Sequence, residues 1–559
     1  MTSQPAAAAA LVCVLAVGCA FGRDPVRAKH AMVVAQEPHA ADVGVAVLKA
    51  GGNAVDAAVA VGFALAVTFP YAGNLGGGGF MLVRMADGRT AFIDFREEAP
   101  LAAFHDMYLD VNGNPTRASI DGWRASGVPG SVRGFEYAHK KFGHKRWAEL
   151  LDPAVQLATN GFPVSYSLYQ SLKPDSASYK RLSQYPESKR IFLGHEVGDT
   201  FTQPELATTL KRIRERGASD FYEGETAHRF AAAMKENGGL ITLQDLQNYK
   251  VADRKPLTGS YRGFDIITSP PPSSGGIGLL QIAGMLDGTG YEKAGAGSAA
   301  VIHYVAECER RYYADRSRFL GDPDFVHVPV KQLLDPKYLA TRRASIDPQR
   351  ATPADQIQPG AIEMHESSET THFDVVDEQG NAVAVTYTLN NGYGSAVTLP
   401  GLGFLLNDEM DDFAAKPGVP NMFHLVQGEA NAIQPGKRPL SSMMPTIVTR
   451  DGKLFMALGA PGGSRIITAV TEVFLNVVDF HMNAQDAVDW PRFHDQWQPD
   501  KLECEYGISP DTIAILRRMG HNAVEANPRE RARVELIMND DGWLQGGHDG
   551  RGAGKAAGY

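Results

Sequence analysis

The run Glu-Thr-Thr-His-Phe-Asp-Val-Val-Asp, residues 369–377, constrains this chain more than any other stretch. It places two threonines directly before an alternating segment, and a second such segment, from Ala382 to Asn390, follows a Gly-Asn pair. A threonine hydroxyl within a chain is a poor nucleophile. It becomes a good one if the peptide bond before it is cut, because the freed α-amine then acts as general base. The run therefore raises the hypothesis of a self-cleaving precursor whose active site is a new N-terminus.

The two alternating segments predict an antiparallel hairpin with strands Thr370 to Val376 and Ala382 to Thr388. A five-residue loop, 377–381, would place Thr370 opposite Thr388. One face then packs and the other stays available for chemistry, whereas a slip of one residue would exchange the two faces. The packing face carries Thr371, Phe373, Val375, Val383, Val385 and Tyr387, and the other carries Thr370, His372, Thr386 and Thr388.

Size and composition are those of a large globular protein. The 559 residues suffice for a large core or for two or three interlocked units. Hydrophobic residues make up 44% of the chain and charged residues 21%, as in ordinary soluble proteins. The net charge of −10 and the absence of a long Lys or Arg run argue against nucleic acid as a partner. The sequence shows no internal repeat.

The first residues are typical of an export signal. Ala6 to Ala20 is apolar but too short to span a bilayer comfortably, and the polar chain begins near Arg23. We therefore expect a signal peptide over residues 1–23 and a periplasmic or secreted protein. The segment before Ala6 lacks Lys and Arg, unlike most signals, so a disordered Ala-rich start is the alternative. The tetrapeptide ending at Cys19 loosely resembles a lipoprotein cleavage box, which leaves a lipid anchor open.

The remaining cysteines and the histidines give no sign of a framework or a metal site. Cys13 lies in the leader with Cys19, and Cys308 and Cys504 are far apart, so two unpaired structural thiols are a better interpretation than a disulfide. The 16 histidines show no ligand spacing such as H-E-x-x-H. No metal and no cofactor are predicted.

Both halves of the chain show hairpin patterns followed by apolar helices, which predicts sheets sandwiched between helix layers. The individual expectations are a buried helix at 54–67 capped by Asn53, a hairpin of 80–84 with 90–95 after the glycine run 76–79, helices across 121–248, a rigid loop at 270–276 opening another helix, a turn-rich connector at 345–369, a second hairpin of 445–450 with 453–460, and a long helix at 465–480.

Several ordered motifs, from about residue 25 to the C-terminus, resemble the γ-glutamyltransferases, also called γ-glutamyltranspeptidases or glutathione hydrolases. No single motif would suffice, but their order makes the resemblance specific. They are Gly76 to Gly79, Asp94-Phe95-Arg96-Glu97, Thr370-Thr371-His372, Thr386 to Asn390, Leu406 to Phe413, Lys437 to Met443, Pro461-Gly462-Gly463-Ser464, Pro491 to His494 and Gln496-Trp497.

The resemblance implies an α+β fold, the four-layer αββα sandwich of N-terminal nucleophile hydrolases. It also implies self-cleavage between Glu369 and Thr370. The products would be a large subunit, 24–369, and a small catalytic subunit, 370–559, which form a heterodimer.

The same resemblance assigns catalytic roles. Thr370 would attack the Glu369 carbonyl during cleavage and a γ-glutamyl amide during turnover. Thr388 resembles the threonine that activates the nucleophile. Gly462 and Gly463 would supply an oxyanion hole at a helix start, although on the residues alone they read as an ordinary strand-to-helix turn.

Six further residues match the γ-glutamyl pocket of the family. A glutamyl group offers an anionic carboxylate, which suits a bidentate arginine with hydroxyl donors, and a cationic amine, which needs acceptors. Taken singly, these residues would read as solvated charges or helix caps. The carboxylate side would be formed by Arg96, Ser441 and Ser442, and the ammonium side by Asn390, Glu409 and Asp412.

The resemblance thus predicts an enzyme that transfers γ-glutamyl from glutathione and related amides to water, amino acids or peptides, in glutathione metabolism and biosynthesis. The alternatives are a cephalosporin or glutaryl acylase of the same superfamily, which needs no ammonium pocket, and an unprocessed binding protein for γ-glutamyl peptides. Two departures are visible. Phe423 stands where many bacterial lid loops have tyrosine, and the tail His548-Asp549-Gly550-Arg551 differs from the commoner Asp-Pro-Arg.

Overall fold

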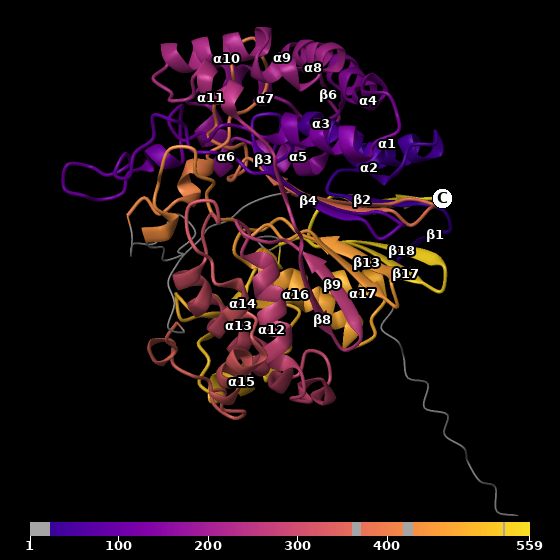
Figure 1. The fold of residues 1–559 in the computed structure, drawn as a ribbon, viewed down its shortest axis with the longest axis vertical. Coiled ribbons are helices and arrows are strands. Elements are labelled where there is room, and N and C mark those ends of the chain that lie inside the picture. The colour runs from indigo at the N-terminus through magenta and orange to yellow at the C-terminus, as the bar shows by residue number, and fades with distance from the viewer. Residues whose placement is uncertain (1–22, 360–370, 417–428, 529–531) are drawn as a thin grey trace, which may run out of the picture.

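A computed structural model describes residues 23–359, 371–416, 429–528 and 532–559. Within these residues two seven-stranded antiparallel sheets stack face to face, and helices cover the outer face of each sheet (Figure 1). From top to bottom of Figure 1 the layers are helices, the upper sheet, the lower sheet and helices. The predicted four-layer αββα sandwich is confirmed.

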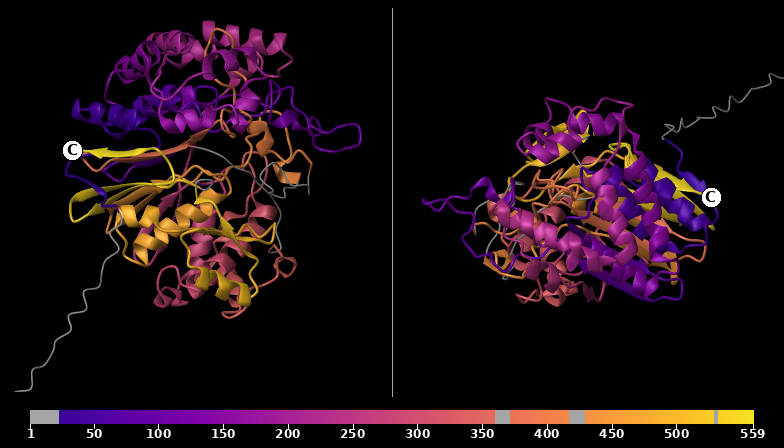
Figure 2. Two further views of the ribbon diagram at one scale, coloured as in Figure 1. Left: turned by 180° about the vertical axis from the view of Figure 1, so that it is seen from behind. Right: turned by 90° about the horizontal axis from the view of Figure 1, so that it is seen from above.

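The upper helix layer comes from the first half of the chain and the lower layer from the second, and Figure 2 shows the same separation from behind. The upper helices are α1 (Pro38–Lys49), α2 (Ala54–Thr68), α3 (Ser131–Phe142), α4 (Trp147–Asn160), α5 (Tyr166–Leu172), α6 (Ala177–Leu182), α7 (Pro186–Phe192), α8 (Pro204–Arg216), α9 (Ala218–Tyr222), α10 (Glu225–Glu236) and α11 (Leu243–Asn248). The lower helices are α12 (Gly275–Leu286), α13 (Ala299–Phe319), α14 (Val330–Leu333), α15 (Pro336–Ala344), α16 (Arg465–Val478), α17 (Ala484–Asp489) and α18 (Pro510–Arg518). Short 3₁₀ turns are η1 (Arg117–Ser119), η2 (Tyr291–Ala294), η3 (Ala354–Gln356), η4 (Glu409–Asp412) and η5 (Glu429–Asn431).

Each large sheet mixes strands from before and after position 369. The upper sheet has the order β19-β2-β10-β11-β3-β4-β7 and the lower sheet β1-β18-β17-β13-β12-β9-β8. The upper strands are β19 (Lys555–Gly558), β2 (Met32–Ala35), β10 (Thr371–Val376), β11 (Ala382–Thr388), β3 (Gly78–Arg84), β4 (Thr90–Phe95) and β7 (Ala252–Arg254). The lower strands are β1 (Val26–Ala28), β18 (Trp543–His548), β17 (Glu535–Asp540), β13 (Lys453–Gly459), β12 (Thr446–Arg450), β9 (Phe264–Thr268) and β8 (Leu257–Tyr261). A small sheet holds β14 (Phe493–His494), β15 (Leu502–Glu505) and β16 (Ala523–Ala526), and β5 (Phe162–Pro163) pairs with β6 (Thr200–Phe201). A cut after residue 369 would therefore leave two polypeptides interwoven in both sheets.

Helix α2 shows why a stretch with no polar face forms a fully buried helix. Its residues are all buried, as its Ala and Val content predicts, and Asn53 and Asp56 form a reciprocal capping box at its start. The helix packs between α1 and the outer face of β10 and β11. Because every face is covered, the helix needs no polar stripe.

The central hairpin has the predicted register. Val376 pairs with Ala382, and Thr371, the first described residue of β10, pairs with Tyr387. The apolar side chains Phe373, Val375, Val383, Val385 and Tyr387 belong to the core shared with the upper helices. The opposite face is not open, because it packs against the lower sheet and its side chains are fully buried.

Other expectations about the framework are also met. The hairpins β3–β4 and β12–β13 lie where the Asp-Gly turns predicted them. Cys308 and Cys504 are buried, and neither is bonded to another cysteine of the described chain. Among the described residues we find no helix with the length and apolar character needed to cross a membrane. The signal-peptide prediction lies mostly outside the described residues.

Candidate active site

The predicted site centres on the end of the central hairpin, where β11 finishes at Thr388. The Thr388 carbonyl accepts a hydrogen bond from Asn74 Nδ2 at 2.8 Å, and its Oγ1 accepts one from the Asn390 N–H at 2.7 Å. Its backbone pairs with Gly78 of β3. Glu369 and Thr370 lie outside the described residues, so their predicted roles stay predictions.

Two asparagines that the sequence reasoning missed fix the chain around Thr388. Asn74 Oδ1 accepts from the Gly77 N–H and the Ser131 hydroxyl, while its amide nitrogen holds β11. Asn407 donates to the carbonyls of Gly76 and Gly127, each at 2.8 Å, and accepts from the Glu409 N–H at 3.0 Å. The sequence signals were the position of Asn74 just before the glycine run and that of Asn407 inside the motif Leu406 to Phe413.

The glycine run 76–79 allows the backbones in this region to approach closely. A Cβ placed on Gly77 would lie 1.9 Å from the Thr388 carbonyl oxygen, and one on Gly76 would lie 2.2 Å from the Leu405 carbonyl oxygen. No side chain fits at these distances. The glycines therefore allow neighbouring backbones to lie close together here, and we do not interpret the run as a phosphate-binding loop.

Arg96 lies fully buried at the end of β4 and is held between two carboxylates. Its Nη1 donates to Glu409 and its Nη2 to Asp412. Nε donates to the Pro439 carbonyl at 3.2 Å and Nη2 also to the Leu440 carbonyl at 3.1 Å. Three predicted pocket residues thus meet, but a bidentate grip on a substrate carboxylate requires Arg96 to release some of these bonds.

The cluster around Arg96 contains more acidic than basic groups. Glu97 Oε2 lies 3.6 Å from Arg96 Nη1, so one guanidinium faces three carboxyl groups. Burial raises the pKa of Glu97 to about 7 against the opposing effect of Arg96. Burial likewise holds the pKa of Glu409 well above its usual range, with Arg96 opposing.

Each side chain predicted to bind an ammonium group has one oxygen that accepts no hydrogen bond from the described chain. Asn390 Oδ1, Glu409 Oε2 and Asp412 Oδ1 are buried with no hydrogen-bond donor among the described residues. Asn390 donates through Nδ2 to the Asp408 carbonyl at 2.9 Å, which places it beside the Glu409 turn. Buried acceptors without donors are costly, so a ligand that donates would relieve them.

Ser441 and Ser442 follow the two carbonyls that bind Arg96. The predicted rigid loop 270–276 supports them, because the Ser441 N–H donates to Pro272 O at 2.8 Å and the Ser274 N–H donates to Ser441 O at 2.7 Å. Ser441 Oγ accepts from the Met443 N–H at 3.1 Å, and Ser442 Oγ accepts from Arg316 at 3.1 Å. Both serines are buried, and their role towards a substrate carboxylate stays a prediction.

Gly462 and Gly463 form the turn between β13 and the start of α16. Their φ angles are +134° and +69°, and a Cβ on Gly462 would lie 2.5 Å from the Ala532 Cα. Position 462 therefore requires glycine, and the left-handed backbone at position 463 favours it. Strand β13 reaches the hairpin because Gly459 packs on the His372 ring, three residues before Gly462. The positive end of the α16 dipole thus lies at this turn.

The predicted site residues therefore form three groups in the structure. One contains Thr388 and Asn390, a second contains Arg96, Glu409 and Asp412 with the adjacent serines, and the third is the glycine turn. The lid residue Phe423 lies outside the described residues. Away from this site, one described group brings metal-binding donors together, namely His303, Glu307 and His521.

The family model described as gamma-glutamyltranspeptidase matches residues 40–559. This chain belongs to the gamma-glutamyltranspeptidase family. It is therefore an enzyme. It is 48% identical to the glutathione hydrolase proenzyme of Pseudomonas sp. (strain A14), over 96% of this chain and 94% of that protein. It is also 48% identical to the glutathione hydrolase proenzyme of Escherichia coli (strain K12), over 94% of this chain and 91% of that protein.

Solved structures agree with the fold. The cephalosporin acylase from Bacillus halodurans superposes with a TM-score of 0.86 at 26% identity, covering 98% of this chain and 99% of that one. The gamma-glutamyltranspeptidase of Helicobacter pylori is 46% identical with a TM-score of 0.57, covering 58% of this chain and 94% of that one. The fold is thus shared by transpeptidases and acylases, and the pocket has to distinguish them.

Proposed function

We propose that this chain is a self-processing γ-glutamyltransferase and glutathione hydrolase whose nucleophile is Thr370. It would cut itself after Glu369 into subunits 24–369 and 370–559. The proposal rests on family membership together with the arrangement around β10 and β11. The interwoven sheets explain how both products would stay associated.

Self-cleavage would begin with attack of the Thr370 hydroxyl on the Glu369 carbonyl carbon. The peptide C–N bond breaks as the C–O bond forms, and the nitrogen takes up the proton to become the free α-amine of Thr370. Water then hydrolyses the ester, which leaves a carboxylate on Glu369 and restores the hydroxyl. The product carries a nucleophile and a base on one residue.

In turnover the same hydroxyl would attack the γ-carbonyl of a γ-glutamyl amide. The α-amine accepts the hydroxyl proton and passes it to the leaving amine, which gives a threonyl ester. Water releases glutamate from this ester, whereas an amino acid or peptide amine forms a new γ-glutamyl amide. The N–H groups at Gly462 and Gly463 would stabilise the tetrahedral oxyanion, and Thr388 would orient the nucleophile.

The observation that carries the substrate assignment is the excess of acidic groups and unbonded acceptors around Arg96. Three acceptor oxygens, on Asn390, Glu409 and Asp412, lack donors within the described chain. A substrate α-ammonium has three N–H donors and one positive charge, so it would satisfy both deficits. The α-carboxylate would go to Arg96 with Ser441 and Ser442. A glutaryl group carries the carboxylate but no ammonium, so this pocket favours γ-glutamyl over glutaryl.

We further propose that the protein is exported. The apolar segment Ala6 to Ala20 and the polar start near Arg23 support removal of residues 1–23. Attachment of a lipid at Cys19 is a separate possibility that the mass of the mature N-terminus would reveal.

The decisive experiment compares the wild type with Thr370→Ala by denaturing gel and intact mass. The wild type should give two polypeptides, the smaller beginning Thr-Thr-His, and Thr370→Ala should remain one chain. Thr371→Ala is the matched control and should still be cut. A Thr370→Ala protein that splits at the same bond would refute the assignment of the nucleophile.

A substrate comparison tests the second half of the proposal. The processed wild type should cleave a γ-glutamyl anilide far faster than a glutaryl anilide. Preference for glutaryl would assign the chain to the acylases, and an uncut wild type without turnover would make it a binding protein.

A further inference from the structure

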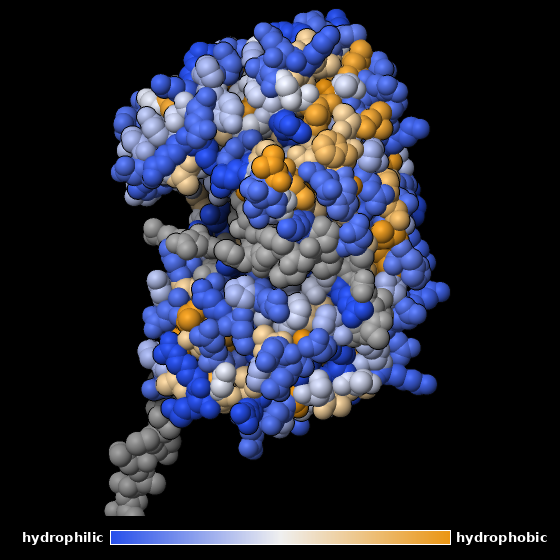
Figure 3. Space-filling view, turned by 90° about the vertical axis from the view of Figure 1, so that its left-hand side faces the viewer, coloured by the Kyte–Doolittle hydropathy of each residue, from blue (hydrophilic) through white to orange (hydrophobic). Residues whose placement is uncertain are grey.

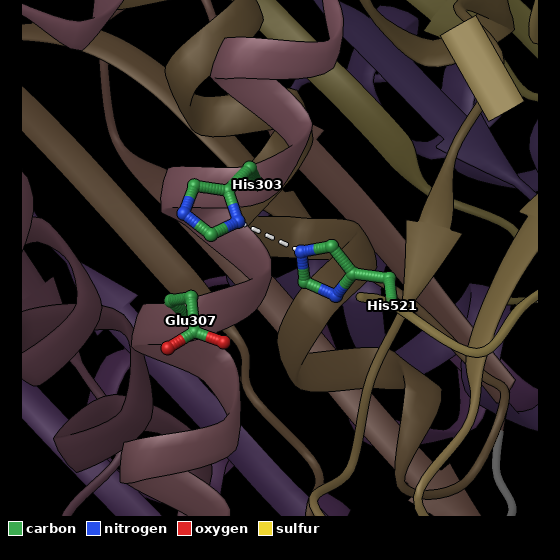
Figure 4. A group of neighbouring side chains, drawn as sticks. All are labelled: His303, Glu307 and His521. Atoms are coloured by element: carbon green, nitrogen blue, oxygen red, sulfur yellow. Dashed lines mark hydrogen bonds between the residues drawn. The ribbon is translucent and has the colours of Figure 1, made fainter. Parts of the chain in front are cut away.

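A buried group of three side chains that could bind a metal lies at α13, in the lower helix layer of Figure 1, and is drawn in Figure 4. His303 and Glu307 project from α13 one turn apart, and His521 follows α18. One donor atom from each residue lies within 4.8 Å of the others. The exposed fractions are 0% for His303 and Glu307 and 4% for His521, so none is a solvated surface group.

The backbone fixes which nitrogen of His303 has a free lone pair. His303 Nε2 lies 2.7 Å from the Asp347 carbonyl oxygen, which can only accept a hydrogen bond. Nε2 therefore carries the proton in the neutral ring, and Nδ1 presents its lone pair to His521 Nε2 at 2.8 Å, the contact drawn in Figure 4. Zinc-binding histidines commonly donate their second nitrogen to a carbonyl in this way.

His521 has nothing to fix its own tautomer on the far side. Its Nδ1 is buried with no hydrogen-bond partner among the described residues. Moving its proton from Nε2 to Nδ1 breaks the bond between the two imidazoles and leaves a buried N–H without an acceptor in the described chain, so a bound cation has to offset both costs. The move leaves two lone pairs facing each other.

The carboxylate of Glu307 is held in place by other side chains and keeps one oxygen available to bind a metal. Its Oε2 accepts from Arg311 Nη1 and Thr352 Oγ1, both at 2.6 Å. Its Oε1 accepts from the Thr352 N–H at 3.0 Å and has only a 3.5 Å contact with Arg310 besides. Oε1 therefore retains a lone pair. The charge of Arg310 is balanced by Asp500.

We propose that His303 Nδ1, His521 Nε2 and Glu307 Oε1 bind a Zn²⁺ ion, with water as a fourth ligand. Two imidazoles and one carboxylate are a ligand set that zinc accepts, at about 2.0–2.2 Å per bond. Tetrahedral geometry then needs ligand atoms about 3.3 Å apart, so the imidazoles would separate slightly and the carboxylate would approach.

Zinc at this position would join three parts of the chain. His303 and Glu307 precede residue 369, His521 follows it, and the supporting Asp347 and Thr352 belong to the connector that leads to the proposed cut. The bridging of two polypeptides rests on the proposed self-cleavage, but metal binding itself does not. Zinc would stabilise the connector and the subunit association in the processed enzyme.

The test measures zinc on the full chain after treatment with a chelator, addition of Zn²⁺ and dialysis. Elemental analysis should find about one zinc per chain in the wild type and in His228→Gln, an exposed control on α10. His521→Gln should lose at least tenfold in zinc affinity, because even outer-shell changes at zinc sites cost that much. Zinc should raise the unfolding temperature of the first two proteins and not of His521→Gln.

If His521→Gln folds poorly, a measurement on the wild type alone can still test the proposal. Co²⁺ in place of Zn²⁺ should give the visible absorption of a four-coordinate site. A wild type that retains no metal, or a folded His521→Gln that retains as much, overturns the proposal. Zinc on the uncut Thr370→Ala chain should match the wild type, so a failed cut refutes the proposed function without affecting this inference.

Discussion

Two buried clusters of charged side chains in this molecule differ in the ratio of cations to acidic groups. Around the C-terminal motif, Arg492 and Arg551 face Asp549 and Glu505, so two cations meet two carboxylates. All four carboxylate oxygens accept hydrogen bonds, including those from the N–H groups of Val534, Arg551 and Arg492. Around Arg96, by contrast, one cation faces three carboxyl groups, and acceptors there lack donors.

The comparison shows how a cluster that can bind a ligand differs from ion pairs that only hold segments of the fold together. In the balanced cluster around the C-terminal motif, every carboxylate oxygen of Asp549 and Glu505 is bonded, and these ion pairs join distant segments of the chain. A cluster with surplus acceptors is unstable by itself and becomes satisfied when a cation arrives. The departure of the tail 548–551 from the family pattern falls in the balanced cluster, so we expect it to affect stability and not substrate choice.

The largest effect is expected for Asp412→Asn. Weakening the contact with the substrate ammonium should cost about 4 kcal/mol, or roughly a thousandfold in kcat/KM for a γ-glutamyl anilide. The glutaryl anilide has no ammonium, so its hydrolysis should change far less. The unfolding temperature should not fall, because the cluster loses surplus charge. Equal losses on both substrates would contradict the ammonium assignment.

Asp549→Asn should show the reverse pattern. It leaves two buried arginines short of a counter-charge, which should lower the free energy of unfolding by about 3 kcal/mol. The kcat/KM of the folded fraction should stay near the wild-type value. Urea denaturation together with active-site titration checks both quantities. A stable but inactive Asp549→Asn would show that the balanced cluster serves catalysis.

The two clusters should also respond to pH with opposite sign. Because the pKa of folded Glu97 is raised to about 7, the folded state keeps a proton that the unfolded state has lost. This group therefore lowers stability as pH rises from about 4.5 to about 7, by at most about 1.4 kcal/mol per pH unit. In Glu97→Gln the decline should be shallower.

Asp549 provides the matched comparison. Burial alone would raise its pKa, but Arg492 and Arg551 outweigh burial and hold the pKa below the usual range. Its contribution is thus present at neutral pH and is lost as pH falls through the folded pKa. Denaturation curves from acid to neutral pH should separate Glu97→Gln from Asp549→Asn, and parallel curves would remove the distinction between the clusters.

The smallest effect is expected for Ser441→Ala. Loss of one neutral hydroxyl donor to the substrate carboxylate should cost about 1 kcal/mol, or roughly a fivefold rise in KM. Since γ-glutamyl and glutaryl groups share this carboxylate, both anilides should be affected equally. A selective loss of γ-glutamyl activity would place Ser441 on the ammonium side instead.

Local patterns predicted the hairpin and its partners well. The period of two and the five-residue loop determined the pairing of β10 with β11, because a slip of one residue would have turned polar side chains towards the upper helices. The glycine run and the motif around Arg96 likewise lie where a resemblance to the family implied. What the sequence did not indicate was that both hairpin faces would be buried, since only the second sheet covers the polar one.

Long-range pairings were beyond sequence reasoning for a physical reason. Asn74 and Asn407 act through backbone carbonyls that become neighbours only in the folded chain. His303 and Glu307 are four residues apart on one helix, but their partner His521 is 218 residues from His303. No spacing rule connects donors that three-dimensional packing alone brings together.

By itself the sequence determined the strand register, the buried helix α2, the family motifs and the proposed cut, because each depends on periodicity or on neighbouring residues. Only the tertiary structure decided how charges are balanced. It placed one arginine among three carboxyl groups around Arg96, and two arginines beside two carboxylates at the C-terminal motif. The reason is that burial and the distance between opposite charges, which together set the energy of an ionised group, are properties of the packed molecule.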